Sequence, residues 1–163
     1  MMSKTSQSLT ISFLLLLLLS ACATVNLPDG ISGDIPKGSE VVIIVSDAPP
    51  EDLFTEIFRE LGRRGYGIED ANQELGSITT EYTAMGDMDA NLQVRVFVES
   101  TEGGSEGRLR GSWSLGSFSS NLFGVELDNM DASWGGPTDK RTHAFAELIE
   151  IALSISNQGI TYE

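Results

Sequence analysis

The sequence contains one histidine, His143, and any catalytic device built on a histidine must use it. A serine hydrolase needs a hydroxyl, a histidine and a carboxylate in a chain, and its serine often lies in a Gly-x-Ser-x-Gly turn. The spacing occurs once, in residues 103–107, but this stretch is predicted to be the loop of a β-hairpin and not the strand-to-helix turn that such a serine requires. A typical zinc site takes three or four ligands from His, Cys and carboxylates, and this chain has one histidine and one cysteine. We therefore predict a protein that is not an enzyme and that has no catalytic residues, metal or cofactor.

Closely spaced acidic residues are the second candidate for chemistry. Residues 87–91 alternate oxygen-bearing side chains like the first ligands of a calcium-binding loop. The EF-hand pattern then requires glycine sixth and glutamate twelfth, where this chain has Leu92 and Val98. The sequence thus excludes an EF-hand. A looser calcium site in residues 87–89 or 128–131 stays an alternative to a charged turn.

The third candidate is a contact surface in residues 117–136, where apolar residues lie among Gly, Asn, Ser and Asp without a clear period. A long loop with apolar side chains is either a packed flap or a recognition loop. Trp113 alternates with other apolar residues of a predicted strand, so we expect it in the core. Trp134, beside two glycines and a proline, is the better candidate for an exposed contact. The side chains proposed to contact a partner are Phe118, Leu122, Phe123 and Trp134.

The charge of the chain narrows the choice of partner. Its 24 Asp and Glu residues outnumber 10 Lys and Arg, a formal net charge of −14 at pH 7. Nucleic-acid binding depends on Lys and Arg that neutralise phosphates, so the acidity argues against it. Acidity also argues against docking flat on an anionic lipid surface.

The N-terminus indicates where the protein is located. Lys4 precedes an unbroken apolar run, Phe13–Leu19, and small residues follow it. The run is too short to cross about 30 Å of hydrocarbon, which needs about 20 apolar residues. A basic start, a short apolar core and small residues are typical of a secretory signal peptide.

The end of this segment, Leu19-Ser20-Ala21-Cys22, resembles the lipobox of bacterial lipoproteins. The resemblance implies that residues 1–21 are a lipoprotein signal peptide and that Cys22 carries diacylglycerol and usually a further acyl chain, such as palmitate. Two or three acyl chains hold a protein durably on a membrane. Cys22 is also the only cysteine, so no internal disulfide forms. Ala23 follows it in place of Asp, which by the same resemblance favours the cell outer membrane within the bacterial envelope.

The remaining chain is predicted to hold a tether and one domain. Residues 22–39 contain Gly, Pro and Asp at short intervals, which favours a lipidated N-terminus followed by a flexible tether. Residues 40–163 have the length of one domain with its own core. The β-branched run 40–45 predicts a strand, and proline and acids after it predict a helix start. The apolar stripe of that helix comprises Leu53, Phe54, Ile57, Phe58 and Leu61.

The rest of the domain predicts strands and a last helix. Residues 92–98 alternate apolar and polar side chains, as do residues 109–115 after a Gly-rich loop, which predicts an antiparallel hairpin. A helix is expected from about residue 137 to Gly159. The predicted class is α+β: an antiparallel sheet of about four to six strands with two helices packed on one face.

The segment Leu61–Thr80 is similar to the segment that leads from a helix into a strand in small helix-grip lipoproteins, such as the C subunit of the outer-membrane β-barrel assembly machine. Those proteins are accessory binders, and the resemblance implies the same role here. The first hypothesis is therefore a membrane-anchored, non-enzymatic module that binds another envelope protein. The alternatives are a carrier of a small ligand or lipid, with a cavity between sheet and helices, and a hydrolase with a cleft around His143.

Overall fold

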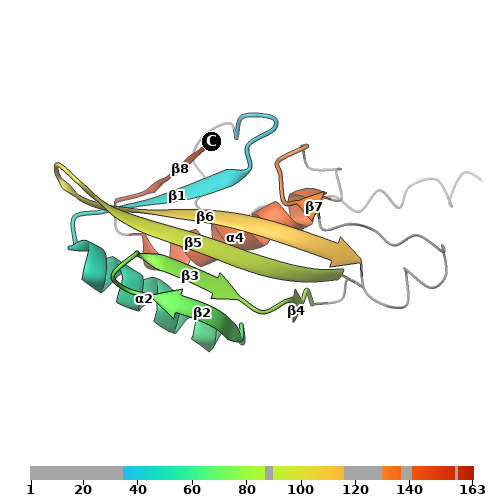
Figure 1. Ribbon diagram of the computed structural model, residues 1–163. Helices are drawn as coiled ribbons and strands as arrows, with labels where there is room; N and C mark the ends of the chain where they lie inside the picture. The colour runs from blue at the N-terminus through green and yellow to red at the C-terminus, as the bar shows by residue number, and fades with distance from the viewer. Residues whose placement is uncertain (1–34, 87–89, 116–129, 137–140, 157) are drawn as a thin grey trace, which may run out of the picture.

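The computed structural model describes residues 35–86, 90–115, 130–136, 141–156 and 158–163. Over these residues the chain forms an α+β fold of two helices and an eight-stranded antiparallel sheet (Figure 1). In chain order the elements are β1 (Val41–Ser46), α2 (Pro50–Arg63), β2 (Ile68–Asn72), β3 (Ser77–Thr80), β4 (Thr83–Ala84), β5 (Ala90–Thr101), β6 (Gly104–Leu115), β7 (Met130–Asp131), α4 (Arg141–Ile155) and β8 (Ile160–Tyr162).

The hairpin of β5 and β6 lies at the centre of the sheet. Its strands have 12 residues each and pair from Ala90 opposite Leu115 to Thr101 opposite Gly104. The order across the sheet is β2-β3-β5-β6-β1-β8, with β4 also beside β5 and β7 also beside β6. The predicted class and hairpin are confirmed, but the strands outnumber the four to six expected. The added β4 and β7 have two residues each and β8 has three, too few to show a period of two.

Helix α2 is amphipathic, as its sequence predicts. Pro50 occupies the first turn, where a proline removes no helical hydrogen bond, and two acids follow at the positive end of the helix dipole. The predicted apolar stripe includes Phe58, but this side chain is 40% exposed. Its position lies about a quarter turn from the middle of the buried face, since a helix turns once in about 3.6 residues. The buried residues are Leu53, Phe54, Ile57, Glu60 and Leu61.

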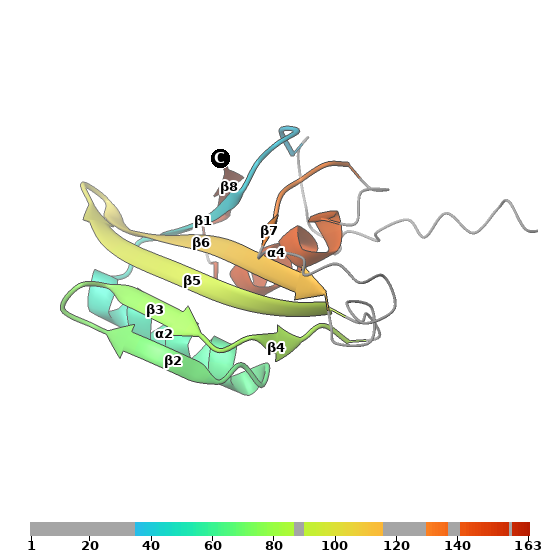
Figure 2. The same ribbon diagram turned by 45° about the vertical axis from the view of Figure 1, so that its right-hand side comes forward.

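Side chains of both helices reach the same face of β6. Gly107 and Gly111 are two of the alternate residues that point to this face, and a Cβ on Gly107 would lie 2.9 Å from Ile57 Cδ1 of α2. A Cβ on Gly111 would lie 3.3 Å from Leu148 Cδ1 of α4. The two views of the ribbon agree, with α2 and α4 behind the strands (Figures 1 and 2). The absence of side chains at these two glycines therefore lets the helices pack closely on the sheet.

The packed region begins before β1, within the stretch predicted to be a tether. Ile35 is part of the hydrophobic core and Ser39 is buried. The Ser39 carbonyl accepts a hydrogen bond from the Trp134 amide at 2.8 Å. At the other end, β8 extends the sheet beside β1. Among the described residues no helix is long and apolar enough to cross a membrane.

Candidate functional site

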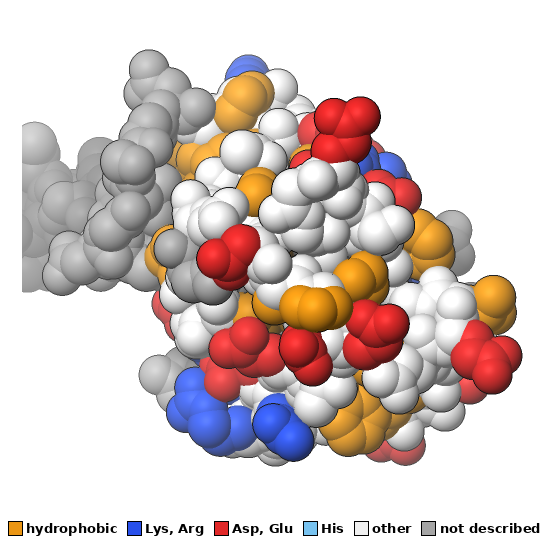
Figure 3. Space-filling view, turned by 90° about the vertical axis from the view of Figure 1, so that its left-hand side faces the viewer, with side chains coloured by type: hydrophobic (Ala, Val, Ile, Leu, Met, Phe, Trp, Pro, Cys, Tyr) orange, Lys and Arg blue, Asp and Glu red, His pale blue; other side chains and the backbone are white. Residues whose placement is uncertain are grey.

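A surface hollow lies where the turn between β2 and β3 meets the start of α2 and the end of β5. We call it the turn hollow; its volume is about 580 Å³ and it is open to solvent. Figure 3 views this end of the molecule, where orange apolar side chains lie among red acidic ones. The residues that line the turn hollow are Pro50, Glu51, Gln73, Glu74, Leu75, Gly76, Phe97, Val98 and Ser100.

The turn that forms one wall is held in place by hydrogen bonds within the turn and to β5. The Leu75 amide donates to Asn72 Oδ1 at 3.1 Å, and the Gly76 amide donates to the Gln73 carbonyl at 3.2 Å. The Gly76 carbonyl accepts from the Val98 amide at 2.8 Å, which ties the turn to β5. Gly76 has φ +66°, and a Cβ there would lie 2.2 Å from the Val98 carbonyl oxygen. The turn therefore requires glycine, and it fixes the position of Leu75.

Two large apolar side chains are presented in this hollow. Leu75 is 65% exposed and Phe97 is 47% exposed. Glu51 and Glu74 line the same hollow. The lining contains no histidine or cysteine, and Ser100 supplies its one hydroxyl. Such a surface can bind an apolar side chain of a partner, with the acids at its rim, but it does not assemble a nucleophile with a base.

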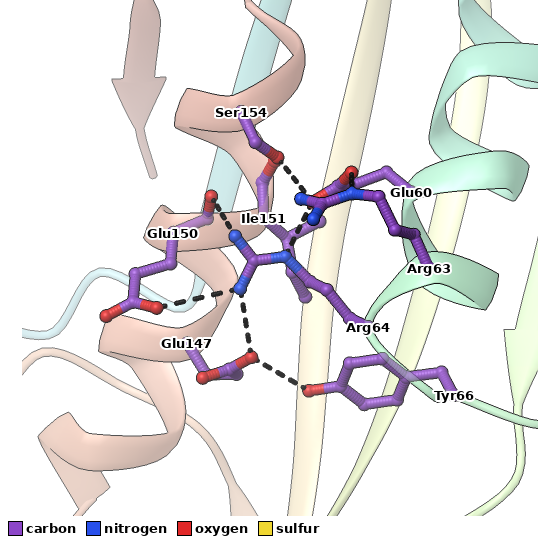
Figure 4. Close-up of polar contacts among 8 residues, drawn as sticks. All are labelled: Glu60, Arg63, Arg64, Tyr66, Glu147, Glu150, Ile151 and Ser154. Atoms are coloured by element: carbon purple, nitrogen blue, oxygen red, sulfur yellow. Dashed lines mark hydrogen bonds and ion pairs between the residues drawn. The ribbon is translucent and has the colours of Figure 1, made fainter.

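A second candidate is the set of charged residues that joins α2 to α4, which we call the helix clasp (Figure 4). Glu60 lies at its centre, and its side chain is 10% exposed. Both its oxygens accept from Arg63 at 2.7 Å, and one also accepts from Arg64 Nε at 2.7 Å and from the Ser154 hydroxyl at 2.8 Å. The residues of the helix clasp are Glu60, Arg63, Arg64, Tyr66, Glu147, Glu150 and Ser154.

Arg64 carries the helix clasp across to α4. Its guanidinium donates to Glu147 Oε1 at 3.3 Å and to the Glu150 carbonyl at 2.9 Å. The Tyr66 hydroxyl donates to the same Glu147 oxygen at 3.4 Å. Burial, and then the charge of Glu147, raises the pKa of Tyr66 above its ordinary value, so the phenol keeps its proton.

The protonation states of the helix clasp indicate a structural role. Hydrogen bonds from Arg63, and then from Arg64 and Ser154, lower the pKa of Glu60 from 4.5 to about 2 against the opposing effect of burial. A carboxylate that is ionised at every physiological pH is not a general acid, and one satisfied by two guanidinium groups is a poor base. The hollow of about 530 Å³ beside it is lined mainly by charged and polar residues. We therefore interpret the helix clasp as a structural network that holds α2 and α4 together.

The residues singled out in the sequence are distributed over the molecule. His143 is half-buried on α4, and no hydroxyl–histidine–carboxylate chain includes it in the described part of the structure. The same residues contain no group of three or more His, Cys, Asp or Glu side chains that could hold a metal ion. The predicted calcium loop 87–89, Asp128 and the lipidation residue Cys22 lie outside the described residues.

The predicted contact residues have a mixed outcome. Phe118, Leu122 and Phe123 lie outside the described residues. The expectation that Trp134 is exposed is wrong: the side chain is 9% exposed and belongs to the hydrophobic core. Its backbone is bonded to residues 38 and 39, which holds this loop segment against the domain. Trp113 is 5% exposed, in agreement with its predicted core position.

Sequence reasoning missed the turn hollow, although a signal existed. Phe97 occupies a polar-face position of β5, between Arg95 and Glu99, where alternation predicts a hydrophilic side chain. Leu75 directly precedes Gly76, in a turn where a large apolar residue has no core to enter. Both departures from the pattern indicated exposed apolar side chains.

No protein-family model matches the sequence, and a search of curated proteins finds no significant match.

Proposed function

We propose that this chain is a lipid-anchored module of the bacterial envelope that binds another envelope protein through the turn hollow, without catalysing a reaction. One observation carries the proposal: a turn fixed by its own hydrogen bonds presents Leu75, beside Phe97, to solvent. Rigid presentation lowers the entropy lost when a partner binds. Apolar anchors at the centre of a polar rim are typical of protein-binding surfaces.

The anchor is the second part of the proposal. Cys22 ends a segment that resembles a lipobox, and acylation there would hold the protein on a membrane, by preference the outer one. Residues between Cys22 and the packed Ile35 would connect the lipid to the domain. A short connection raises the effective concentration of the turn hollow near partners in the same membrane.

The ligand-carrier alternative needs space between the sheet and the helices. Ile57 and Leu148 fill that space at Gly107 and Gly111, where even one added carbon would lie 2.9 Å from a neighbouring atom. The two hollows described above lie on the surface, with openings to solvent. This packing favours the protein-binding role over the carrier role.

The experiment is photo-crosslinking in native membranes. A photo-reactive phenylalanine analogue replaces Leu75 in one strain and Gln158, an exposed residue outside the lining of the turn hollow, in another. We expect one adduct of defined mass from position 75 and none from position 158. A Cys22→Ser version should give a much weaker adduct, since it cannot be acylated. Absence of an adduct from position 75, or the same products from both positions, would contradict the proposal.

A further inference from the structure

Three arginines lie on the face of the β5–β6 hairpin that points away from the helices. We call Arg95, Arg108 and Arg110 the hairpin arginines. In the strand register Arg95 is directly opposite Arg110, and Arg108 is opposite Phe97. The alternate residues of β6, such as Leu109 and Gly111, point to the helix side. Arg95 and Arg110 are both exposed.

The hairpin arginines differ in their partners. Arg108 forms an ion pair with Glu163. Arg95 donates to the Ser112 hydroxyl at 2.6 Å, which is a neutral acceptor. Neither Arg95 nor Arg110 has a carboxylate within ion-pair distance among the described residues. Two arginines are therefore directly opposite in the strand register, and neither has a carboxylate partner among the described residues.

This arrangement is unfavourable for folding, since like charges directly opposite on neighbouring strands repel. The chain has 24 acidic and 10 basic residues, so the residue opposite an arginine would more often be acidic than basic. The next row toward the hairpin turn in which two charged residues are opposite each other also pairs like charges, because Glu99 is opposite Glu106. Positive and negative side chains on this face are thus separated along the hairpin. This separation costs stability, but it can orient a charged ligand.

We propose that Arg95 and Arg110 bind carboxylates of an acidic segment in the partner protein, whose apolar side chain occupies the turn hollow. The inference rests on the proposed function and specifies the chemistry of the partner. Phe97 joins the two surfaces: it lines the turn hollow, and it lies on the same face as Arg95, two residues along β5. Paired guanidinium groups suit carboxylates because each offers a planar fork of donors.

The size of the positive area favours one acidic segment over an anionic membrane. Glu99 and Glu106 bound it toward the hairpin turn, and Glu163 neutralises Arg108. The rest of the chain is acidic, with a formal net charge of −14, so attraction for anions is confined to this small area, which fits a short acidic segment and not an extended anionic surface. What remains is one pair of positive charges, large enough for one or two carboxylates.

The test titrates the full-length protein, in neutral detergent, with succinate as a probe that carries two carboxylates. Succinamide, which has the same shape without charge, is the matched control ligand. We expect the side-chain Nε–H signals of Arg95 and Arg110 to shift with succinate and not with succinamide. Arg110→Gln should weaken succinate binding about tenfold, as expected for loss of a charged hydrogen-bond donor. Arg59→Gln, which removes an exposed charge from α2, should leave it unchanged.

The same variants in the crosslinking strain separate this inference from the proposed function. Arg110→Gln should reduce the adduct from position 75, whereas Arg59→Gln should not. An undiminished adduct, or unchanged succinate affinity, in Arg110→Gln overturns the acidic-segment inference and leaves the turn hollow in place. Binding to phosphatidylglycerol vesicles that depends on Arg110, without succinate binding, also overturns it. Absence of any adduct in the unmodified background overturns the proposed function itself.

Discussion

The arginines of the helix clasp and the hairpin arginines have opposite surroundings. Arg63 and Arg64 share the carboxylate of Glu60, and Arg64 also reaches two acceptors on α4. Arg95 and Arg110 are directly opposite in the strand register, and both are exposed. In the helix clasp the charged groups already pair with one another, so they stabilise the fold and have few donors or acceptors available for a ligand. The hairpin pair has no carboxylate partner among the described residues, which lowers stability and leaves its charge available to a ligand, as in a binding site.

Replacement of Glu60, at the centre of the helix clasp, tests whether these ion pairs stabilise the fold. Glu60→Gln should lower the free energy of unfolding by about 2–3 kcal/mol, because it removes the buried carboxylate that Arg63 and Arg64 share and leaves half-buried Arg64 without its nearest counter-charge. Urea unfolding at pH 7 measures the change. Glu56→Gln, an exposed residue of the same helix, is the control and should stay within about 0.5 kcal/mol of wild type. Equal effects would show that the helix clasp does not hold α2 and α4 together.

Acid should remove the same contribution. The pKa of Glu60 is lowered from 4.5 to about 2 in the folded protein, so its stabilising effect is complete above the unfolded value and is lost as pH falls toward 2. Unfolding free energies of wild type and Glu60→Gln should therefore differ by a constant amount from pH 7 to about 5 and converge between pH 4.5 and 2. A difference that persists at pH 2 would contradict the assigned pKa.

Gly76→Ala tests whether the turn hollow is held as rigidly as the helix clasp. Its Cβ would lie 2.2 Å from the Val98 carbonyl oxygen at φ +66°, so we expect a loss of about 2–3 kcal/mol in stability. Gly38→Ala is the control, with φ +92° and no atom within 4 Å, and should cost about 1 kcal/mol. Similar losses in the two variants would mean that the turn relaxes freely.

Replacing one of the hairpin arginines should have a smaller effect on stability than the variants above, and it should raise stability where they lower it. Arg110→Gln should raise Tm by about 1–4 °C relative to Arg59→Gln, since both variants lose one charge but only the first relieves repulsion from Arg95. Thermal unfolding in dilute buffer without polyvalent anions measures it. A lower Tm for Arg110→Gln would show that this arginine already has a stabilising partner.

The spacing of apolar residues along the sequence predicted the longer strands and the buried face of the first helix. Alternation over residues 92–98 and 109–115 identified the central hairpin, and the apolar spacing of α2 identified its buried face. The strands of two or three residues carry no period. Trp134 is buried because a loop packs on the domain, and glycine-rich neighbours do not reveal this packing.

The candidate site could be predicted less well, for a related reason. The turn hollow brings together Pro50, Leu75 and Phe97, which are far apart in the sequence and meet only in the folded domain. Likewise, the Glu60–Arg64 pair of the helix clasp follows from spacing within one helix, whereas the contact of Arg64 with Glu147 spans 83 residues. The cross-strand pair of Arg95 and Arg110 follows from the register, which the sequence alone does not fix.

Leu75→Ser tests most directly whether the turn hollow binds a partner or merely belongs to the fold. Leu75 is 65% exposed, so its replacement should change the free energy of unfolding by less than about 0.5 kcal/mol. A photo-reactive residue at Ser100, on the wall of the same hollow, reports the partner in native membranes. We predict wild-type stability together with loss of the adduct. An adduct that persists at wild-type yield in the stable Leu75→Ser protein would contradict the central claim.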